Sequence, residues 1–96
     1  MTRTVQSVVK SLKFKNILKI NKVKKIALFG SHASGNARFK SDIDFLADFE
    51  DGADLFDQIS LKNDLERLFK KKVDVVTRAG LNKYIRAGIL RGAVEL

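Results

Sequence analysis

The stretch from Gly30 to Asp44 reads GSHASGNARFKSDID and directly follows the apolar run IALF. This order indicates a hydrophobic strand that stops at a Gly-Ser step, a polar loop with a second glycine, and a second strand that begins at Asp42. Side chains alternate between the two faces of a strand, so Asp42 and Asp44 point to one face, while Ile43 and Phe45 point to the other. The stretch therefore predicts a sheet with one apolar face and one acidic face.

The two carboxylates of this stretch need a compensating charge. Along one strand face they lie about 7 Å apart and repel each other. A hard divalent cation such as Mg²⁺ takes oxygen ligands and meets this need best. The Gly30-Ser31 step is complementary, because glycine lets the backbone approach a phosphate closely and free N–H groups at such turns attract anions. An anion cradle beside metal-binding carboxylates predicts a site for a nucleoside triphosphate and Mg²⁺.

Three segments show the apolar period of helices that pack on a sheet. The first begins after Thr4, its expected N-cap, and ends at Asn21, because asparagine tolerates left-handed geometry. Another runs from Leu55 to Phe69 and is capped by Asp54, and a last helix is expected from about residue 82. The positions expected to face the core in the first two helices are Val5, Val8, Val9, Leu12, Phe14, Ile17, Leu18, Ile20, Phe56, Ile59, Leu61, Leu65, Leu68 and Phe69.

Strands are expected over residues 24–29, 42–49 and 73–77. In the third, Asp74 alternates with valines and so leaves the valine-lined face, as Asp42 and Asp44 leave their apolar neighbours. A lone aspartate in a short apolar strand is unfavourable unless it has a partner. The expected fold class is therefore α/β (α+β): a small mixed sheet with helices on one face and the site on the other. Whether residues 92–96 add an edge strand is left open.

The composition describes a small, basic chain without cysteine. With 96 residues and 45% apolar content, a single domain over residues 1–96 is expected, with apolar side chains for one core. Nineteen basic and eleven acidic residues give a formal net charge of +8, which favours anionic partners such as nucleotides, nucleic acid or an acidic protein. No aromatic-studded basic groove specifically supports nucleic acid. A cytoplasmic location without membrane contact is expected, since no segment resembles a membrane span or a signal peptide.

The Gly-Ser step, the loop and Asp-x-Asp together resemble the signature of the nucleotidyltransferase superfamily that includes DNA polymerase beta and kanamycin nucleotidyltransferase. The surroundings Ala33, Gly35 and Ser41 are most similar to its smallest members, the minimal nucleotidyltransferases. The likeness continues through VDVV at residues 73–76 and ILRGAV at residues 89–94, so it covers the chain from about Lys24 onward. This resemblance implies the nucleotidyltransferase fold that is similar to the polymerase beta palm.

The resemblance also assigns the site. Asp42 and Asp44 would hold two Mg²⁺ ions, Asp74 would complete the site as the third catalytic and metal-binding residue, and ATP would be the substrate. The residues that the resemblance assigns to nucleotide binding are Gly30, Ser31 and Ser41. Two loop positions depart from the family pattern, because His32 stands where arginine is more frequent and Ser34 stands where a basic residue is common. Candidates to compensate by reaching the triphosphate are Arg38 and Lys40.

The activity implied by the resemblance is Mg²⁺-dependent transfer of a nucleoside monophosphate, AMP from ATP, to a hydroxyl. The chain has no residues left for an acceptor-binding domain, so a partner must present that hydroxyl. Minimal nucleotidyltransferases are paired with HEPN-domain toxins, which implies a tyrosine of such a toxin as acceptor and an antitoxin role for this chain.

Other functions stay open at this point. A catalytically weak nucleotide-binding module that neutralises its partner by stoichiometric complex formation would suit the departures at positions 32 and 34. A basic RNA-binding protein is a further alternative, with an affinity that falls steeply with salt. An exposed sheet edge or an amphipathic end would also support a homo-oligomer.

Overall fold

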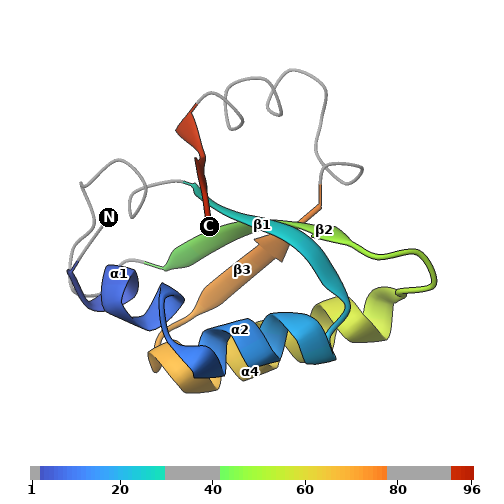
Figure 1. Ribbon diagram of the computed structural model, residues 1–96, viewed down its shortest axis with the longest axis horizontal. Helices are drawn as coiled ribbons and strands as arrows, with labels where there is room; N and C mark the ends of the chain where they lie inside the picture. Colours follow the sequence, from blue (N-terminus) through green and yellow to red (C-terminus); the bar gives the residue numbers. More distant parts are fainter. Residues whose placement is uncertain (1–2, 30–41, 78–91) are drawn as a thin grey trace.

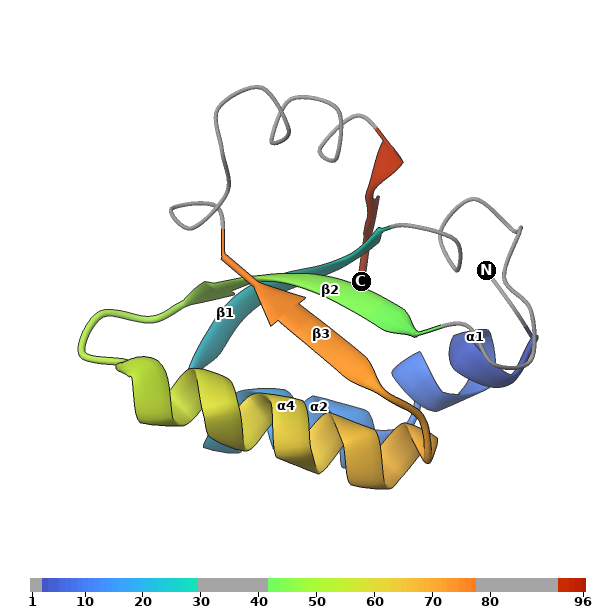
Figure 2. The same ribbon diagram turned by 180° about the vertical axis from the view of Figure 1, so that it is seen from behind.

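The computed structural model describes residues 3–29, 42–77 and 92–96. The elements in these ranges are, in order, α1 (Arg3–Val9), α2 (Leu12–Ile20), β1 (Val23–Phe29), β2 (Ile43–Phe49), α4 (Leu55–Phe69), β3 (Val73–Val76) and β4 (Val94–Glu95). Figure 1 shows α1, α2 and α4 on one face of the sheet, and the view from behind in Figure 2 agrees. The predicted mixed sheet with helices on one face is therefore confirmed. The helix expected from residue 82 lies outside the described residues.

The strands form one sheet in the order β3-β2-β1-β4. Strand β1 runs antiparallel to both β2 and β4, whereas β2 and β3 are parallel. The predicted strands agree with the observed ones to within one residue at each end. The register between β1 and β2 shifts between Val23 and Lys25, which leaves Lys24 as the extra residue of a bulge. Residues 94–95, left open by the sequence, form the edge strand β4 beside β1.

Three phenylalanines join the helical layer to the sheet. Phe14 of α2, Phe45 of β2 and Phe69 of α4 are all buried, and their ring centroids lie 5.8 to 6.1 Å apart. Aromatic pairs at such distances prefer tilted or edge-to-face geometry, and the pair Phe14–Phe69 is close to edge-to-face at 79°. The core is thus centred on β2, the strand between β1 and β3.

The N-terminal helical segment is interrupted between α1 and α2, at a position that the sequence pattern did not locate. Helix α1 already begins at Arg3, so the prediction of Thr4 as N-cap is wrong. The chain breaks at Ser11, whose hydroxyl accepts a hydrogen bond from the Phe14 N–H and donates one to the Val8 carbonyl. This N-cap starts α2 in a new phase with Phe14 toward the core. Leu12 (72% exposed) and Ile20 (74% exposed) consequently point to solvent, against the prediction that both are core residues.

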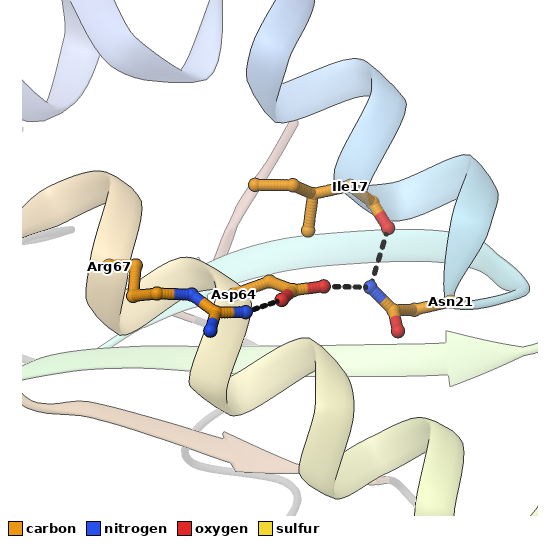
Figure 3. Close-up of polar contacts among 4 residues, drawn as sticks. All are labelled: Ile17, Asn21, Asp64 and Arg67. Atoms are coloured by element: carbon orange, nitrogen blue, oxygen red, sulfur yellow. Dashed lines mark hydrogen bonds and ion pairs between the residues drawn. The ribbon is translucent and has the colours of Figure 1, made fainter.

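Asn21 ends α2 as predicted, but in a different conformation. Its φ is −93°, and the left-handed residue is instead Lys22, with a φ of 59°. The Asn21 side chain is buried, and its Nδ2 donates hydrogen bonds to the Ile17 carbonyl (2.8 Å) and to Asp64 of α4 (2.9 Å). Arg67 pairs with the other oxygen of the same carboxylate (Figure 3). A buried amide is stable only when it is hydrogen-bonded, so this network fixes the end of α2 against α4.

Helix α4 has the predicted bounds and the predicted cap. The Asp54 carboxylate accepts a hydrogen bond from the Asp57 N–H, and the Asp57 carboxylate accepts one from the Asp54 N–H, which forms a capping box. Fewer side chains of α4 face the core than predicted, however, because Phe56 is 79% and Ile59 is 47% exposed. With 3.6 residues per turn, Phe56 projects about opposite to the buried Leu65. No helix in the described ranges has the length and apolarity needed to cross a membrane.

Side chains of α4 also form hydrogen bonds with backbone groups of β3. The Glu66 carboxylate accepts hydrogen bonds from the Lys62 ammonium (3.1 Å) and from the Val73 N–H (3.2 Å), and Gln58 donates one to the Val75 carbonyl (3.0 Å). The hydrogen bond from Lys62, followed by that from Val73, lowers the pKa of Glu66 below its ordinary value. The position of β3 therefore depends on a charged glutamate.

We expect Phe14→Ala to lower the free energy of unfolding by about 3–5 kcal/mol, because it removes a ring from the buried cluster. Phe56→Ala makes the same chemical change at an exposed position and should alter stability by less than about 0.5 kcal/mol. Urea denaturation at constant pH measures both. Equal losses in the two variants would contradict the assignment of Phe56 to the solvent-exposed side of α4.

Acid should lower the free energy of unfolding of the wild-type protein, partly because Glu66 becomes protonated. Because the pKa of this carboxyl is lowered on folding, its stabilising contribution is complete above the ordinary glutamate value of about 4.3 and is lost as the pH falls through the lowered folded pKa. Glu66→Gln should thus have a lower urea midpoint at pH 7 and a smaller loss between pH 5 and about pH 3. Glu50→Gln, in the exposed turn before α4, is the control. Wild-type and Glu66→Gln curves with the same acid dependence would contradict this role.

Candidate active site on the helix-free face

The alternation along β2 decides which side chains leave the core. Ile43, Phe45 and Ala47 are fully buried and belong to the core cluster that packs against the helices. The residues between them, Asp44 and Leu46, must therefore project to the opposite face. None of the described helices α1, α2 and α4 lies on that face, and we call it the helix-free face in this sense only. The sequence-based prediction for Asp44 is confirmed in this respect.

The pairing of β2 with β3 brings two predicted site residues side by side. Asp44 pairs with Asp74 in the parallel register, and it pairs with Phe29 on the antiparallel side. Neighbouring strands are about 4.8 Å apart, and paired residues point to the same face. Val73 and Val75 belong to the core cluster, so Asp74 shares the helix-free face with Asp44.

Asp42 directly precedes β2. The Ile43 N–H donates to the Lys72 carbonyl (3.0 Å), so the ladder with β3 extends to the start of the strand. Asp42 is two residues before Asp44 along an extended chain, so the two side chains point to the same face. Asp42 and Asp74 are exposed, and Asp44 is half-buried. Three carboxylates thus belong to one end of the helix-free face.

The registers divide this face into three rows that cross the strands. The carboxylate row contains Phe29, Asp44 and Asp74; the apolar row contains Ala27, Leu46 and Val76, with Glu95 of β4 paired to Ala27; and the charged row contains Lys25 and Asp48. Successive rows are about 6.7 Å apart, because two residues separate them along each strand. The carboxylate row is therefore followed directly by a row of apolar side chains, of which Ala27 and Leu46 are buried.

The donor atoms of the carboxylate end fit a hard cation. Mg²⁺ prefers carboxylate oxygens, and adjacent carboxylates are stabilised when a divalent charge lies between them. In the described part of the chain, however, no three His, Cys, Asp or Glu side chains are already gathered as a metal-binding group. Asp42, Asp44 and Asp74 share a face without meeting at one point. Their residue types, rather than a preformed cage, suit a metal that is bound together with a substrate.

Several predicted site residues lie outside the described residues, namely Gly30, Ser31, His32, Ser34, Arg38, Lys40 and Ser41. Their assigned roles in nucleotide binding therefore stay predictions. Sequence reasoning missed Phe29 and Asp48 as residues of the same face. The two-residue period that selected Asp42 and Asp44 also reaches Asp48, which is the signal that would have found it.

The comparisons with known proteins agree with this architecture. Residues 12–96 match the family model described as polymerase beta, nucleotidyltransferase. The protein adenylyltransferase MntA of Thermococcus cleftensis is 39% identical over 72 residues, which are 75% of this chain and 73% of the relative.

Two solved structures are similar over most of the chain. A structure described as a minimal nucleotidyltransferase has a TM-score of 0.77 and 35% identity and covers 95% of this chain and 87% of its own. A toxin–antitoxin structure with AMP-PNP has a TM-score of 0.72 and 25% identity, with coverages of 86% and 68%. The chain belongs to the polymerase beta nucleotidyltransferase family and, within it, to the minimal nucleotidyltransferases.

Proposed function

We propose that this chain transfers AMP from ATP to a hydroxyl of a protein partner, and that the partner is a HEPN-domain toxin which the chain thereby inactivates. The observation that carries the proposal is the pairing of Asp44 with Asp74 on the helix-free face, with Asp42 at the same end. Relatives point the same way: one is named a protein adenylyltransferase, and another was crystallised in a toxin–antitoxin complex with an ATP analogue.

The residues that would hold Mg²⁺ are Asp42, Asp44 and Asp74. When bound, the ion would neutralise phosphate charge and favour the ionised form of the attacking hydroxyl. The chain's own contribution is positional, because Asp44 belongs to the central strand and Asp74 is fixed beside it by the ladder between β2 and β3. Charge stabilisation and alignment are the main requirements of such transfers, so few side chains need to react.

The proposed step is a displacement at phosphorus. The acceptor oxygen forms a bond to the α-phosphorus of ATP, and the bond from that phosphorus to the oxygen bridging the β-phosphorus breaks. Pyrophosphate leaves with the electron pair, and the acceptor proton passes to a carboxylate oxygen of Asp74. Asp74 is exposed on the helix-free face, where a partner's hydroxyl has access to it. The products are an adenylylated partner and pyrophosphate.

The sequence offers one argument for a second function, neutralisation by a stoichiometric complex with a weak nucleotide site. His32 stands where the family more often has arginine, and Ser34 stands where a basic residue is common. A binding module has less need of these basic side chains than an enzyme that must hold a triphosphate. Protection of cells by a triple variant, Asp42→Asn, Asp44→Asn and Asp74→Asn, would favour this function over catalysis.

Asp44→Asn should lower adenylyl transfer to the co-purified partner by on the order of 100-fold, because it removes the central carboxylate and weakens charge stabilisation in the transition state. The complex of the chain with its co-purified partner is incubated with Mg²⁺ and ATP labelled at the α-phosphate, and a denaturing gel shows whether the partner becomes labelled. Asp51→Asn, in the exposed turn between β2 and α4, removes the same charge outside the site and should retain labelling. Full labelling in the Asp44 variant would overturn the proposed function.

A further inference from the structure

The excess positive charge of the chain comes from residues 1–29. This segment contains eight basic residues and no aspartate or glutamate, which leaves eleven basic and eleven acidic residues in the rest of the chain. The formal net charge of +8 therefore belongs to the segment that forms α1, α2 and β1. Solubility does not require such a separation, because a surface with both signs of charge interspersed is soluble as well.

The fold gathers much of this charge on the outer side of the helical layer. The start of α2 lies beside the end of α4, since the rings of Phe14 and Phe69 are in contact. The exposed lysine Lys70, which follows Phe69, is thus near the start of α2. We call the exposed lysines on and next to these two helices the lysine surface; they are Lys10, Lys13, Lys15, Lys19 and Lys70.

Carboxylates of the described residues do not offset the lysine surface. The ion pairs in the described ranges engage Lys22, Lys62 and Arg67, and none of them includes a lysine of this surface. Asp64 lies between α2 and α4, but Asn21 and Arg67 already engage its two oxygens (Figure 3). An anion from outside therefore meets a field of one sign there.

The same lysines lower the stability of α2. Lys15 and Lys19 are four residues apart in the helix, and like charges at this spacing repel each other. Lys13 lies in the first turn, which contains no acidic residue, although the positive end of the helix dipole favours negative charge there. A local rule that is broken without a structural gain points to a function, and a bound polyanion would relieve both repulsions.

A groove of about 470 Å³ between α2 and α4 adjoins the lysine surface. Three of its side chains, Lys13, Asn16 and Arg67, have N–H donors, which are the groups that contact phosphate oxygens in complexes with nucleic acids. Among the described residues, the lining is completed by Ile17, Asp64 and Leu68.

The composition of the lysine surface distinguishes between kinds of anionic partner. The centres of protein–protein interfaces are enriched in aromatic residues and arginine and depleted of lysine. Here the charges are all lysines, and the aromatic residue of α2, Phe14, is buried. Single-stranded nucleic acid also needs exposed aromatic rings on which its bases stack. A duplex keeps its bases inside and offers phosphates, so it suits this surface better than a protein or a single strand does.

We infer that the lysine surface binds the phosphate backbone of double-stranded nucleic acid without reading its sequence. This binding is a second function apart from adenylyl transfer, because the helical layer and the carboxylates Asp44 and Asp74 lie on opposite faces of the sheet. Lysine ammonium groups interact with phosphates as point charges and displace the counterions of the duplex. The affinity should accordingly fall steeply as the salt concentration rises.

Lys15→Glu separates binding from stability. It removes a phosphate contact, but it also places a glutamate four residues before Lys19, which is the favourable order for a helix. Fluorescence anisotropy with a short labelled duplex should show a Kd raised about fivefold or more at about 50 mM salt, together with a weaker salt dependence. The urea midpoint should stay the same or rise.

The matched control is Lys24→Glu, which makes the same charge change at the exposed bulge of β1. Its Kd should change by less than about twofold, since only a distant charge is altered. Equal losses of affinity in the two variants would show that net charge, rather than the lysine surface, governs binding, and would overturn the inference. If Lys15→Glu lowers the urea midpoint, Lys13→Glu replaces it, because an acidic residue in the first turn of α2 suits the helix dipole.

The choice of probe identifies the partner. RNA and DNA duplexes of the same sequence are titrated in parallel, and the tighter of the two is the source of the backbone. Poly-L-glutamate that competes as well as unlabelled duplex at equal charge concentration would assign the surface to an acidic protein and overturn the inference. Absence of binding to both duplexes at about 50 mM salt would also overturn it. No ATP is present, so the result does not depend on the proposed function.

Discussion

The two-residue period of β2 is the constraint on which the rest of the structure depends. Every second side chain of this strand, from Ile43 to Ala47, is fully buried against the helices, so the intervening Asp44 has no place in the core. An ionised carboxylate in that core would cost several kcal/mol even after relaxation of its surroundings. A slip of one residue would therefore expose the apolar set and bury the acidic one, which makes the register strongly specified.

The central position of β2 turns this local alternation into a site. Because β1 and β3 both pair with it, a residue from each neighbour is placed beside Asp44, and one of them is Asp74. The helices contribute by fixing the opposite side, where Phe14 and Phe69 pack around Phe45. In the described residues, the two faces of the sheet thus differ: one packs against α1, α2 and α4, and the other carries the carboxylates of the candidate site.

Sequence reasoning reached the elements with a strong local signal. The expected cap Asp54 and the apolar period predicted the bounds of α4, and alternation predicted the face of Asp74. It failed at Ser11, because the apolar spacing continued across this residue, whereas the cap there starts α2 as a separate helix and leaves Leu12 exposed. The partner of Asp74 across the ladder depends on strand order and register, and neither is encoded in one segment.

The hydrogen bonds from Gln58 and Glu66 to β3 have a consequence for association. Strand β3 is at an end of the described sheet order, and a bare edge there is a template for another chain's strand. Here, instead, the Val73 N–H donates a hydrogen bond to Glu66 and the Val75 carbonyl accepts one from Gln58, both of helix α4. An incoming strand would first have to displace both, one of them a charged carboxylate. The protein is in this way shielded from β-augmentation and from edge-to-edge aggregation at the strand that carries Asp74.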